Sequence, residues 1–421
     1  MKNQVNAAII TVGDELLIGQ TIDTNSAFIA AELNKTGIWV KRRVAVGDVK
    51  EEILETLKLQ SKDCQLIIIT GGLGPTGDDI TKPALCEYFG AKIIVDEGAL
   101  QNVKDIFTRL NRPVMLERNL KQAEVPDNCT VLPNKRGTAP GMWFEKDGVV
   151  YVSLPGVPNE MIGLMEDIVL SKLKEHFILP VIIHRTLFTM GQGESMIADT
   201  LSDFEKKIPS HIKLAYLPNY GAVKLRLTGI SENEEKLQTE LEDLFQEMKG
   251  LLQEWVVADE DITLQEVVAK LLDKHKLFVG TAESCTGGYL AHLFTARPGS
   301  SSSFKGSVVS YANEAKEKVL GVQHSTIVTK GAVSEETVTE MLTGIITTMN
   351  VDYAIATSGI MGPDGGTKEK PVGTVWIGVA NRKHMKTSKY FFRFDRKRNI
   401  ELTANNALNM LRKFILEEEG E

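Results

Sequence analysis

The sequence predicts an α/β protein with two α/β domains, whose sheets are mainly parallel or mixed, joined by a small α+β segment. In about the first 170 residues, apolar β-rich runs alternate with helical patterns, which is typical of a parallel sheet covered by helices on both faces. Near residue 180 the pattern changes to shorter strands and helices, and a second alternating block begins near residue 258. The length of 421 residues also exceeds what one hydrophobic core usually serves.

The periodicity of apolar residues places the expected elements. The first domain, residues 1–172, is expected to contain strands at 7–12, 65–70 and 149–154 and helices at 25–35 and 50–60. The small segment, residues 178–255, is expected to contain strands at 181–188, 212–216 and 222–229 and helices at 194–206 and 231–253. The last domain, residues 259–417, is expected to contain helices at 264–275 and 400–416 and a strand at 277–281.

Composition argues against several classes of function. The chain has 48 basic and 56 acidic residues, a formal net charge of −8, which makes broad contact with nucleic acid an unlikely main role. Its four cysteines form no CxxC pair and its seven histidines form no HxxxH or HExxH motif, so a zinc site has little support. No apolar stretch approaches the length of a membrane span. We therefore expect a cytoplasmic protein with reduced thiols and no membrane partner.

A serine lies at a strand-to-helix junction of the last domain. Ser284 follows a β-rich run, and a helical run starts at Tyr289. Amide groups at such a junction can hold an oxyanion or a phosphate, so the amides of residues 284–288 are candidate donors. The alternative is that Ser284 or Thr286 only caps the helix.

A hydroxyl nucleophile needs a base, and no histidine lies in a persuasive position. Tyr311 and Lys316 stand near a second strand-to-helix junction and support a serine–lysine pair. Lys316 needs burial or a cationic neighbour to lower its pKa, because an ordinary surface lysine stays protonated. Cys285 is a rival nucleophile, since a thiol is intrinsically more reactive than a hydroxyl.

Two further loops are assigned to the same site. Residues 358–367 form a glycine-rich segment after an apolar run, and its amides can cradle a phosphate, although any tight turn also requires glycine. The serine run 300–303 is interpreted as an ordered active-site loop rather than a linker, because periodic apolar patterns resume on both sides.

In the first domain, carboxylates gather beside glycine-rich turns. The segments 13–17, 23–26, 46–48 and 70–81 lie at expected carboxyl ends of strands, where open α/β sheets bind ligands. Hard carboxylate oxygens bind magnesium while amides hold phosphate, so these segments suit a phosphate ester or diphosphate bridged to a divalent cation. The alternative is helix capping by Asp23, Asp48 and Asp78.

Several motifs of the last domain carry a family resemblance. TAESCTGG, KGSVVSYANEAK, LGV, KGAVS and SGIMGPDGGTKEKPVGTVWIG occur within residues 260–415 in the order and spacing of the CinA C-terminal family, which includes nicotinamide mononucleotide deamidases. The resemblance implies Ser284 as nucleophile, Lys316 as its base and Tyr311 in the proton relay, with no metal or organic cofactor. The expected substrate contacts are Thr286, Gly287, Gly288, Ser358, Gly359, Gly365, Gly366 and Arg396.

The first domain resembles the molybdopterin-binding domain that begins CinA proteins, through its glycine-rich turns, NKRGTAPG at 134–141 and LPGVPNEM at 154–161. In that family the domain is associated with metal-dependent ADP-ribose pyrophosphatase activity. The resemblance implies Asp48 and Asp79 as ligands of Mg, Mn or Co. The other residues expected at the nucleotide site are Asp14, Asn25, Ser26, Gly71, Gly72, Gly74 and Asp78.

The middle segment resembles the KH-related segment of the same family and is interpreted as a spacer or dimer element. Because it lacks a stripe of basic residues, this segment is not expected to bind RNA. Together the domains predict an enzyme of pyridine-nucleotide salvage, and the family resemblance implies a homodimer. It would convert nicotinamide mononucleotide to nicotinate mononucleotide and ammonia, and ADP-ribose to AMP and ribose 5-phosphate. Two alternatives remain: a nonenzymatic nucleotide-binding or interaction protein of the competence or DNA-damage response, and a protein whose first domain only senses a ligand.

Overall fold

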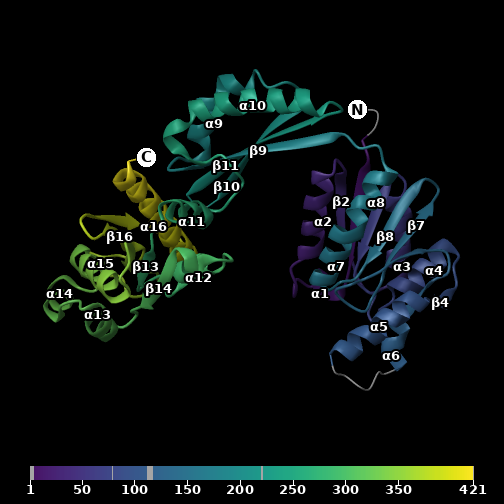
Figure 1. Cartoon of the computed structure of the whole chain (residues 1–421), viewed down its shortest axis with the longest axis horizontal. Coiled ribbons are helices and arrows are strands. Elements are labelled where there is room, and N and C mark those ends of the chain that lie inside the picture. The colour runs from purple at the N-terminus through teal and green to yellow at the C-terminus, as the bar shows by residue number, and fades with distance from the viewer. Residues whose placement is uncertain (1–3, 78, 111–116, 220, 421) are drawn as a thin grey trace. The chain divides into compact units, whose positions relative to one another are not determined.

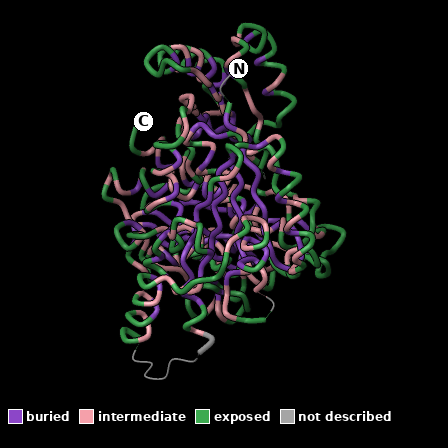
Figure 2. Tube along the Cα trace, turned by 90° about the vertical axis from the view of Figure 1, so that its right-hand side faces the viewer, coloured by how far each residue is buried: buried purple, intermediate pink, exposed green. Residues whose placement is uncertain are grey.

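The structure is a computed structural model that describes residues 4–77, 79–110, 117–219 and 221–420. The chain divides into two compact units, residues 1–183 with 229–238 and residues 184–228 with 239–421. Figure 1 shows their helices and strands, and Figure 2 shows that buried residues follow the central strands while exposed residues follow the outer turns. Within the described residues, no helix is both long and apolar enough to cross a membrane.

The first unit is built on a six-stranded sheet in the order β2-β1-β3-β8-β7-β6. The first four strands in this order are parallel, and β7 and β6 extend the sheet in antiparallel fashion. The strands are β1 (Asn6–Val12), β2 (Trp39–Val46), β3 (Leu66–Thr70), β6 (Thr130–Leu132), β7 (Gly141–Lys146) and β8 (Val149–Leu154). A short pair, β4 (Ile93–Val95) and β5 (Glu124–Pro126), stands apart from this sheet.

Helices cover both faces of the six-stranded sheet, as the alternating pattern predicts. Ile29, Leu33 and Met161 pack on one face of β1 and β3, and Ile53 and Leu85 pack on the other. The helices are α1 (Asp14–Leu17), α2 (Thr24–Lys35), α3 (Lys50–Gln60), α4 (Thr81–Phe89), α5 (Glu97–Arg109), α6 (Glu117–Leu120), α7 (Pro158–Leu164) and α8 (Leu170–His176).

A smaller four-stranded sheet follows in the chain, in the order β10-β11-β9-β12. In this sheet β12 pairs with β9 in antiparallel fashion. The helix expected at 231–253 is shorter than predicted, because Ser231 still belongs to the preceding strand. The elements are β9 (Val181–Met190), α9 (Glu194–Glu205), β10 (Ile212–Asn219), β11 (Ala222–Ser231), α10 (Glu234–Leu251) and β12 (Val256–Ala258).

The last domain contains a five-stranded mixed sheet in the order β14-β13-β15-β16-β17. The strands β14, β13 and β15 are parallel, and β16 and β17 are antiparallel to their neighbours. The strands are β13 (Val279–Glu283), β14 (Phe304–Val309), β15 (Tyr353–Gly359), β16 (Thr374–Asn381) and β17 (Met385–Phe391). The helices are α11 (Leu264–His275), α12 (Tyr289–Thr295), α13 (Asn313–Leu320), α14 (His324–Lys330), α15 (Glu335–Met349) and α16 (Arg396–Glu419).

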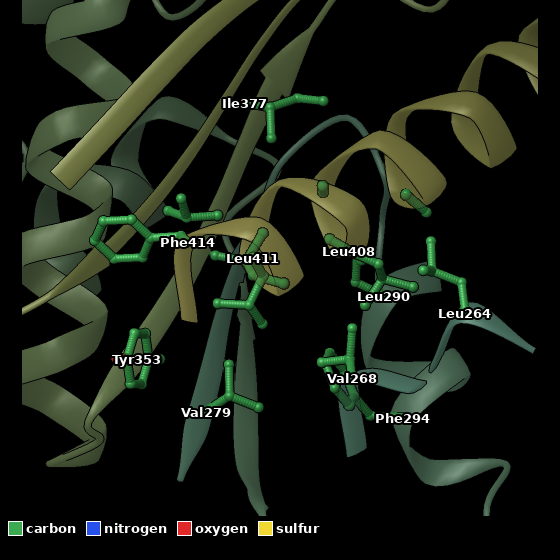
Figure 3. Close-up of a cluster of buried hydrophobic side chains, with 14 of the residues drawn as sticks. Leu264, Val268, Val279, Leu290, Phe294, Tyr353, Ile377, Leu408, Leu411 and Phe414 are labelled. Atoms are coloured by element: carbon green, nitrogen blue, oxygen red, sulfur yellow. The ribbon is translucent and has the colours of Figure 1, made fainter. Parts of the chain in front are cut away.

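The core on one face of this sheet is formed by α11, α12 and α16. Leu408 and Leu411 of α16 and Leu290 of α12 lie in one buried cluster with Val279 and Tyr353 of the strands (Figure 3). Val338, Leu342 and Ile345 of α15 form the opposite core with Ala282, Ala354 and Ala356. These apolar residues recur every three or four positions along each helix, which gives each helix one face to bury.

Local capping explains where two elements differ from the sequence prediction. The strand expected at 277–281 begins at Val279, because the amide of Leu277 still closes the end of α11 by donating to the Leu272 carbonyl. The last helix begins four residues earlier than expected, because the Asp395 side chain accepts a hydrogen bond from the Arg398 amide and caps it.

Both parallel regions have a topological switch point, where consecutive strands are added on opposite sides of a central one. It lies between β1 and β3 in the first sheet and between β13 and β15 in the last. Open α/β sheets bind ligands outside the carboxyl ends of the strands at this point. The fold therefore directs attention to the residues that follow β1, β3, β13 and β15.

Gly344 allows α15 to approach α13, and we predict that Gly344→Ala destabilises the last domain by about 1–3 kcal/mol. A Cβ atom at this position would overlap the backbone carbonyl of Leu320. A Cβ atom at Gly250, in α10, would meet no heavy atom of the described residues within 4 Å, so Gly250→Ala is the matched helical control and should be neutral or stabilising. Scanning calorimetry of both variants tests this; equal melting temperatures for Gly344→Ala and the parent would contradict it.

Candidate functional site

Ser284 stands at the switch point of the last sheet, directly after β13. Its amide donates to the carbonyl of Thr357 on β15 over 3.0 Å, and the Ser310 amide donates to the Glu283 carbonyl over 2.8 Å. Glu283 pairs with Val309 of β14 and with Thr357 of β15. Ser284 therefore lies in register between Ser310 and Ser358, and only 8% of its surface is exposed.

Alternation along β13 separates Ser284 from Cys285. Ala282 belongs to the buried cluster on the α15 face, whereas Cys285 belongs to the cluster on the α16 face. Ser284 directly follows the strand, and continued alternation places its side chain on the face of Ala282. Burial raises the pKa of Cys285 to about 12, so this thiol stays protonated, and the structure argues against it as the rival nucleophile.

Glu283 holds the turn that follows Ser284, a role that the sequence analysis missed. Its carboxylate is fully buried and accepts hydrogen bonds from the amides of Gly288 (3.0 Å), Leu290 (3.1 Å) and Ala291 (2.8 Å). The hydroxyls of Thr281 and Ser307 donate to it as well. A carboxyl residue at the end of an apolar strand, followed after three residues by a glycine pair, is the sequence signal that could have identified it.

Because Glu283 satisfies these amides, neither alternative capping role applies. Gly288 is the N-cap of α12, without a side-chain cap. The hydroxyl of Thr286 instead pairs with that of Thr357 at 2.8 Å. Ser284 is therefore not used as a helix cap. The Thr286 hydroxyl, which is predicted to contact substrate, already has a partner within the protein.

Lys316 is buried beside this strand end, as its predicted role requires. It is 1% exposed, and its Nζ donates to the carbonyls of Ser310 (2.7 Å) and Tyr311 (3.2 Å). Burial lowers the pKa of Lys316. A buried amine with a lowered pKa is neutral over a wider range of pH than a surface lysine.

Arg396 connects Tyr311 to the glycine-rich loop. Tyr311 is 63% exposed, and its Oη accepts a hydrogen bond from Arg396 Nη2 over 3.0 Å. Arg396 Nη1 donates to the carbonyl of Gly362 over 2.9 Å. Asn399, which the sequence analysis missed, is buried one turn later and donates to the carbonyls of Met361 and Phe394. The structure thus brings Arg396 to the site through contacts with its loops.

The candidate oxyanion donors are fewer than predicted. The amide of Gly287 donates to the Ser284 carbonyl, and that of Gly288 donates to Glu283. Among the described residues, the amides of Cys285 and Thr286 donate to no backbone carbonyl. Gly287 and Gly288 have φ values of 60° and 97°, so their conformation shapes the turn while the two preceding amides remain as donors.

The glycine-rich loop after β15 is held by contacts within the protein. Ser358 is buried and donates to the Ala332 carbonyl over 2.6 Å. Lys370 Nζ donates to the carbonyls of Lys330 and Val333. A Cβ atom at Gly359 or Gly366 would meet residues of the same loop and of β16, whereas Gly365 takes a left-handed φ of 92°. Chain packing therefore accounts for these glycines, and their contact with substrate stays a prediction.

The interpretation of residues 300–303 as an active-site loop is wrong. Ser300–Ser302 form a short helical turn, Ser302 Oγ donates to Asp273, and the Ser303 carbonyl accepts from Val279 at the start of β13. This places the serine run at the amino ends of the parallel strands. The site residues lie at the other end of these strands, after their carboxyl ends.

In the first domain, Asn25 lies at the switch point between β1 and β3. Its Nδ2 donates to the Gly156 carbonyl (2.8 Å) and to the Thr70 hydroxyl (3.2 Å), while its buried Oδ1 has no partner among the described residues. A cavity of about 130 Å³ is lined by these three residues together with Gly71 and others. This is smaller than the roughly 300–1,000 Å³ of most small-molecule pockets, so it suits one part of a larger ligand.

The other predicted residues of this site mainly shape its loops. Asp23 caps α2 by accepting from the Ser26 amide and hydroxyl, and Arg43, which the sequence analysis missed, donates to Ser26 Oγ. A Cβ atom at Gly71 would overlap the Val12 carbonyl, and one at Gly72 would overlap the Thr81 side chain. These two glycines are therefore required by the turn itself.

The predicted metal ligands do not form a metal-binding group. Asp14 and Asp48 accept hydrogen bonds from each other's amides, and Asp79 accepts from the amides of Gly74 and Thr76 and from the Thr76 hydroxyl. Asp78 lies outside the described residues. Within the part of the chain that the structure describes, no group of three or more His, Cys, Asp or Glu could hold a metal ion. These carboxylates fit loop closure rather than a divalent cation.

The fold and these contacts define an α/β protein with a polar site at the switch point of each of two sheets. Three known families match the chain: the CinA C-terminal domain at residues 261–415, the probable molybdopterin binding domain at 8–175 and the damage-inducible protein CinA KH domain at 184–258. A CinA-like protein of Cytophaga hutchinsonii is 45% identical over 417 residues, covering 99% of this chain and 100% of that protein. The chain belongs to the CinA family.

One further relative supports the same assignment, and two solved structures are similar to parts of the chain. A putative competence-damage inducible protein of Acetivibrio thermocellus is 38% identical over 416 residues, covering 99% of this chain and all of its own length. The crystal structure of a CinA superfamily protein from Klebsiella pneumoniae has 35% identity and covers 37% of this chain and 99% of its own, with a TM-score of 0.36. A CinA protein of unknown function from Thermoplasma acidophilum has 34% identity, covers 42% of this chain and 99% of its own, and has a TM-score of 0.36.

Glu283→Gln should destabilise the last domain by about 2–4 kcal/mol, because an amide nitrogen would replace an oxygen that accepts from buried backbone amides and would leave donors unpaired. Glu314→Gln, an exposed carboxylate at the start of α13, is the matched control and should change stability little. Thermal unfolding followed by circular dichroism measures both. A Glu283→Gln protein as stable as the Glu314→Gln control would show that these hydrogen bonds are not needed.

Proposed function

We propose that the last domain hydrolyses the carboxamide of nicotinamide mononucleotide to nicotinate mononucleotide and ammonia. The observation that carries the proposal is the buried position of Lys316, whose Nζ contacts carbonyls rather than a carboxylate, beside the strand end that bears Ser284. A neutral lysine has two N–H groups and one lone pair. The carbonyls of Ser310 and Tyr311 accept two hydrogen bonds from Nζ, so the lone pair is left to take a proton.

The proposed reaction uses Ser284 as a nucleophile. The Ser284 hydroxyl proton passes to Lys316, and Oγ forms a bond to the carboxamide carbon. The amides of Cys285 and Thr286 donate to the developing oxyanion, and each well-placed donor is typically worth about 3 kcal/mol. As the C–N bond breaks, the protonated Lys316 returns the proton to the leaving nitrogen, and ammonia departs. Water then attacks the ester, gives its proton to Lys316, and Ser284 recovers its own.

Substrate orientation is assigned to Arg396. Its guanidinium lies at the exposed end of the site, held by the Tyr311 hydroxyl and the Gly362 carbonyl. Guanidinium groups suit phosphate because their donors are planar and permanently charged. We therefore place the ribose phosphate near Arg396 and the carboxamide near Ser284.

For the first domain we propose that the cavity lined by Asn25 binds part of a nucleotide. The cleavage of ADP-ribose to AMP and ribose 5-phosphate with Mg, Mn or Co, which the family resemblance implies, stays a prediction. The carboxylates proposed as ligands, Asp48 and Asp79, already accept hydrogen bonds from backbone amides, so we assign them no step that passes through a metal. A homodimer likewise stays a proposal.

Ser284→Ala should abolish ammonia release from nicotinamide mononucleotide, because the variant lacks the hydroxyl that attacks the carboxamide. Cys285→Ala is the matched control and should keep the activity, since its thiol lies in the opposite core. Both are assayed with chelator present, which silences a metal-dependent first domain. Retention of ammonia release in Ser284→Ala would disprove the assigned nucleophile, and a folded parent without any release would favour the nonenzymatic binding protein.

The pH dependence of kcat should report Lys316. Only the neutral amine accepts a proton, so kcat should rise with pH through the pKa of Lys316 and then level off, and burial moves this rise below the usual value for lysine. Lys316→Met should lower kcat by about 10²–10⁴-fold and remove the rise. Lys318→Met, an exposed position on the same helix, should leave the profile unchanged. A profile that Lys316→Met does not alter would exclude this base.

A further inference from the structure

Ser310 has a buried hydroxyl for which the described structure offers no partner. The residue is 0% exposed, and its Oγ is buried without a hydrogen bond. Buried hydroxyls are nearly always paired, and an exception calls for an explanation. The backbone of Ser310 is fully engaged, since its amide donates to Glu283 and its carbonyl accepts from Lys316. Only the side-chain hydroxyl of Ser310 lacks a hydrogen bond among the described residues.

The register of the sheet places this hydroxyl beside Ser284. Val309 pairs with Glu283 in the parallel ladder, so Ser310 and Ser284 are the next residues on neighbouring strands, about 4.8 Å apart along the hydrogen-bonding direction. Val308 and Ala282 pair one step earlier, and both contribute to the core on the α15 face. Alternation then puts the Ser310 and Ser284 side chains on that same face.

Two neighbouring hydroxyls have hydrogen-bond partners, unlike that of Ser310. Ser358, on the other side of Ser284, donates its hydroxyl to the Ala332 carbonyl. The Tyr311 hydroxyl is directed to Arg396 and belongs to a side chain that is 63% exposed. Ser310 is thus the buried hydroxyl of this edge that stays without a partner among the described residues, and its own carbonyl lies 2.7 Å from Lys316 Nζ.

We propose that the Ser310 hydroxyl carries the proton between Ser284 Oγ and Lys316 Nζ. This rests on the proposed function, in which Ser284 attacks and Lys316 accepts. A hydroxyl can accept one proton while it donates another. Ser310 Oγ has no hydrogen-bond partner among the described residues, so its side chain turns toward Ser284 and Lys316 for the transfer. The Ser284 O–H bond then breaks as a new O–H bond forms on Ser310, and the former Ser310 proton forms the third N–H bond of Lys316. Ser310 is unchanged after the transfer, and the return of the proton to the leaving nitrogen follows the reverse path.

The first test measures activation of Ser284 without the natural substrate. A fluorophosphonate probe labels an activated serine when Oγ displaces fluoride and gives up its proton, and mass spectrometry detects the labelled peptide. Ser310→Ala and Ser310→Cys should label at least about ten-fold more slowly than the parent. Ser303→Ala, a buried serine at the opposite end of the same strand region, should label at the parent rate.

The second test measures the number of protons in flight during ammonia release from nicotinamide mononucleotide. In mixtures of H₂O and D₂O, the parent should give a curved dependence of kcat that fits two transferred protons. Ser310→Ala should lower kcat about ten-fold or more, leave KM within about two-fold, and give a linear dependence. Tyr311→Phe should keep the curved dependence, which separates Ser310 from the tyrosine as the relay.

The outcomes separate this inference from the proposed function. If the parent releases ammonia or is labelled, but Ser310→Ala matches it in rate and in proton number, the relay is disproved and Ser284 remains the nucleophile. If the parent is labelled at Ser284 but releases no ammonia, the substrate assignment fails, and the labelling rates still decide the relay. If a folded parent shows neither reaction, both the proposed function and the relay are overturned.

Discussion

The buried carboxylate of Glu283 is the interaction on which the geometry of the last domain's site depends. A glycine pair between a strand and a short helix has many conformations, and the entropy of fixing it opposes folding. By accepting hydrogen bonds from Gly288, Leu290 and Ala291, the carboxylate closes the turn and satisfies the first amides of α12. Ser284 stands between this turn and the end of β13, so its position follows from the same contacts.

Two ionisable side chains, Glu283 and Lys316, are buried near this strand end with different surroundings. The Glu283 carboxyl group accepts hydrogen bonds from three backbone amides and two hydroxyls. Lys316 is surrounded by carbonyls and apolar residues, where burial disfavours the ammonium form and lowers the pKa. The protein thereby buries a carboxyl group that closes a turn and an amine with a lowered pKa at the same strand ends, and Cys285 lies in the core on the α16 face.

The fold class could be predicted from the sequence because hydrophobic periodicity is strong in both α/β domains. Helices with clear caps were placed well: the helix expected at 264–275 begins after a Thr263–Glu266 capping box and has the expected bounds. The strand before Ser284 was placed two residues early, because the apolar Leu277 and Phe278 look like strand residues although they complete a turn. The α/β assignment and the membership of the CinA family are confirmed; the roles of individual site residues stay predictions.

Site residues were harder to predict when their role depends on contacts between distant segments. Ser284, Lys316 and Arg396 carry motif information, but nothing local shows that Asn399 or Ser310 is buried. The glycines beside the sites were interpreted as ligand contacts, yet several are required by backbone packing, as at Gly71 and Gly359. The carboxylates Asp14 and Asp48 bind each other's amides, a pairing across 34 positions of the chain that only the parallel order of β1 and β2 reveals.

The two hydrogen bonds of Arg396 have a further consequence, which concerns preorganisation. An arginine side chain that is free in solution loses about 1.5–2 kcal/mol of conformational entropy when it is fixed. In this protein the Gly362 carbonyl and the Tyr311 hydroxyl fix the guanidinium before any ligand arrives. That entropy is lost once, during folding, and an anion that meets the remaining N–H groups does not incur it again. The same two hydrogen bonds join α16 to two loops, so the guanidinium has one fixed orientation.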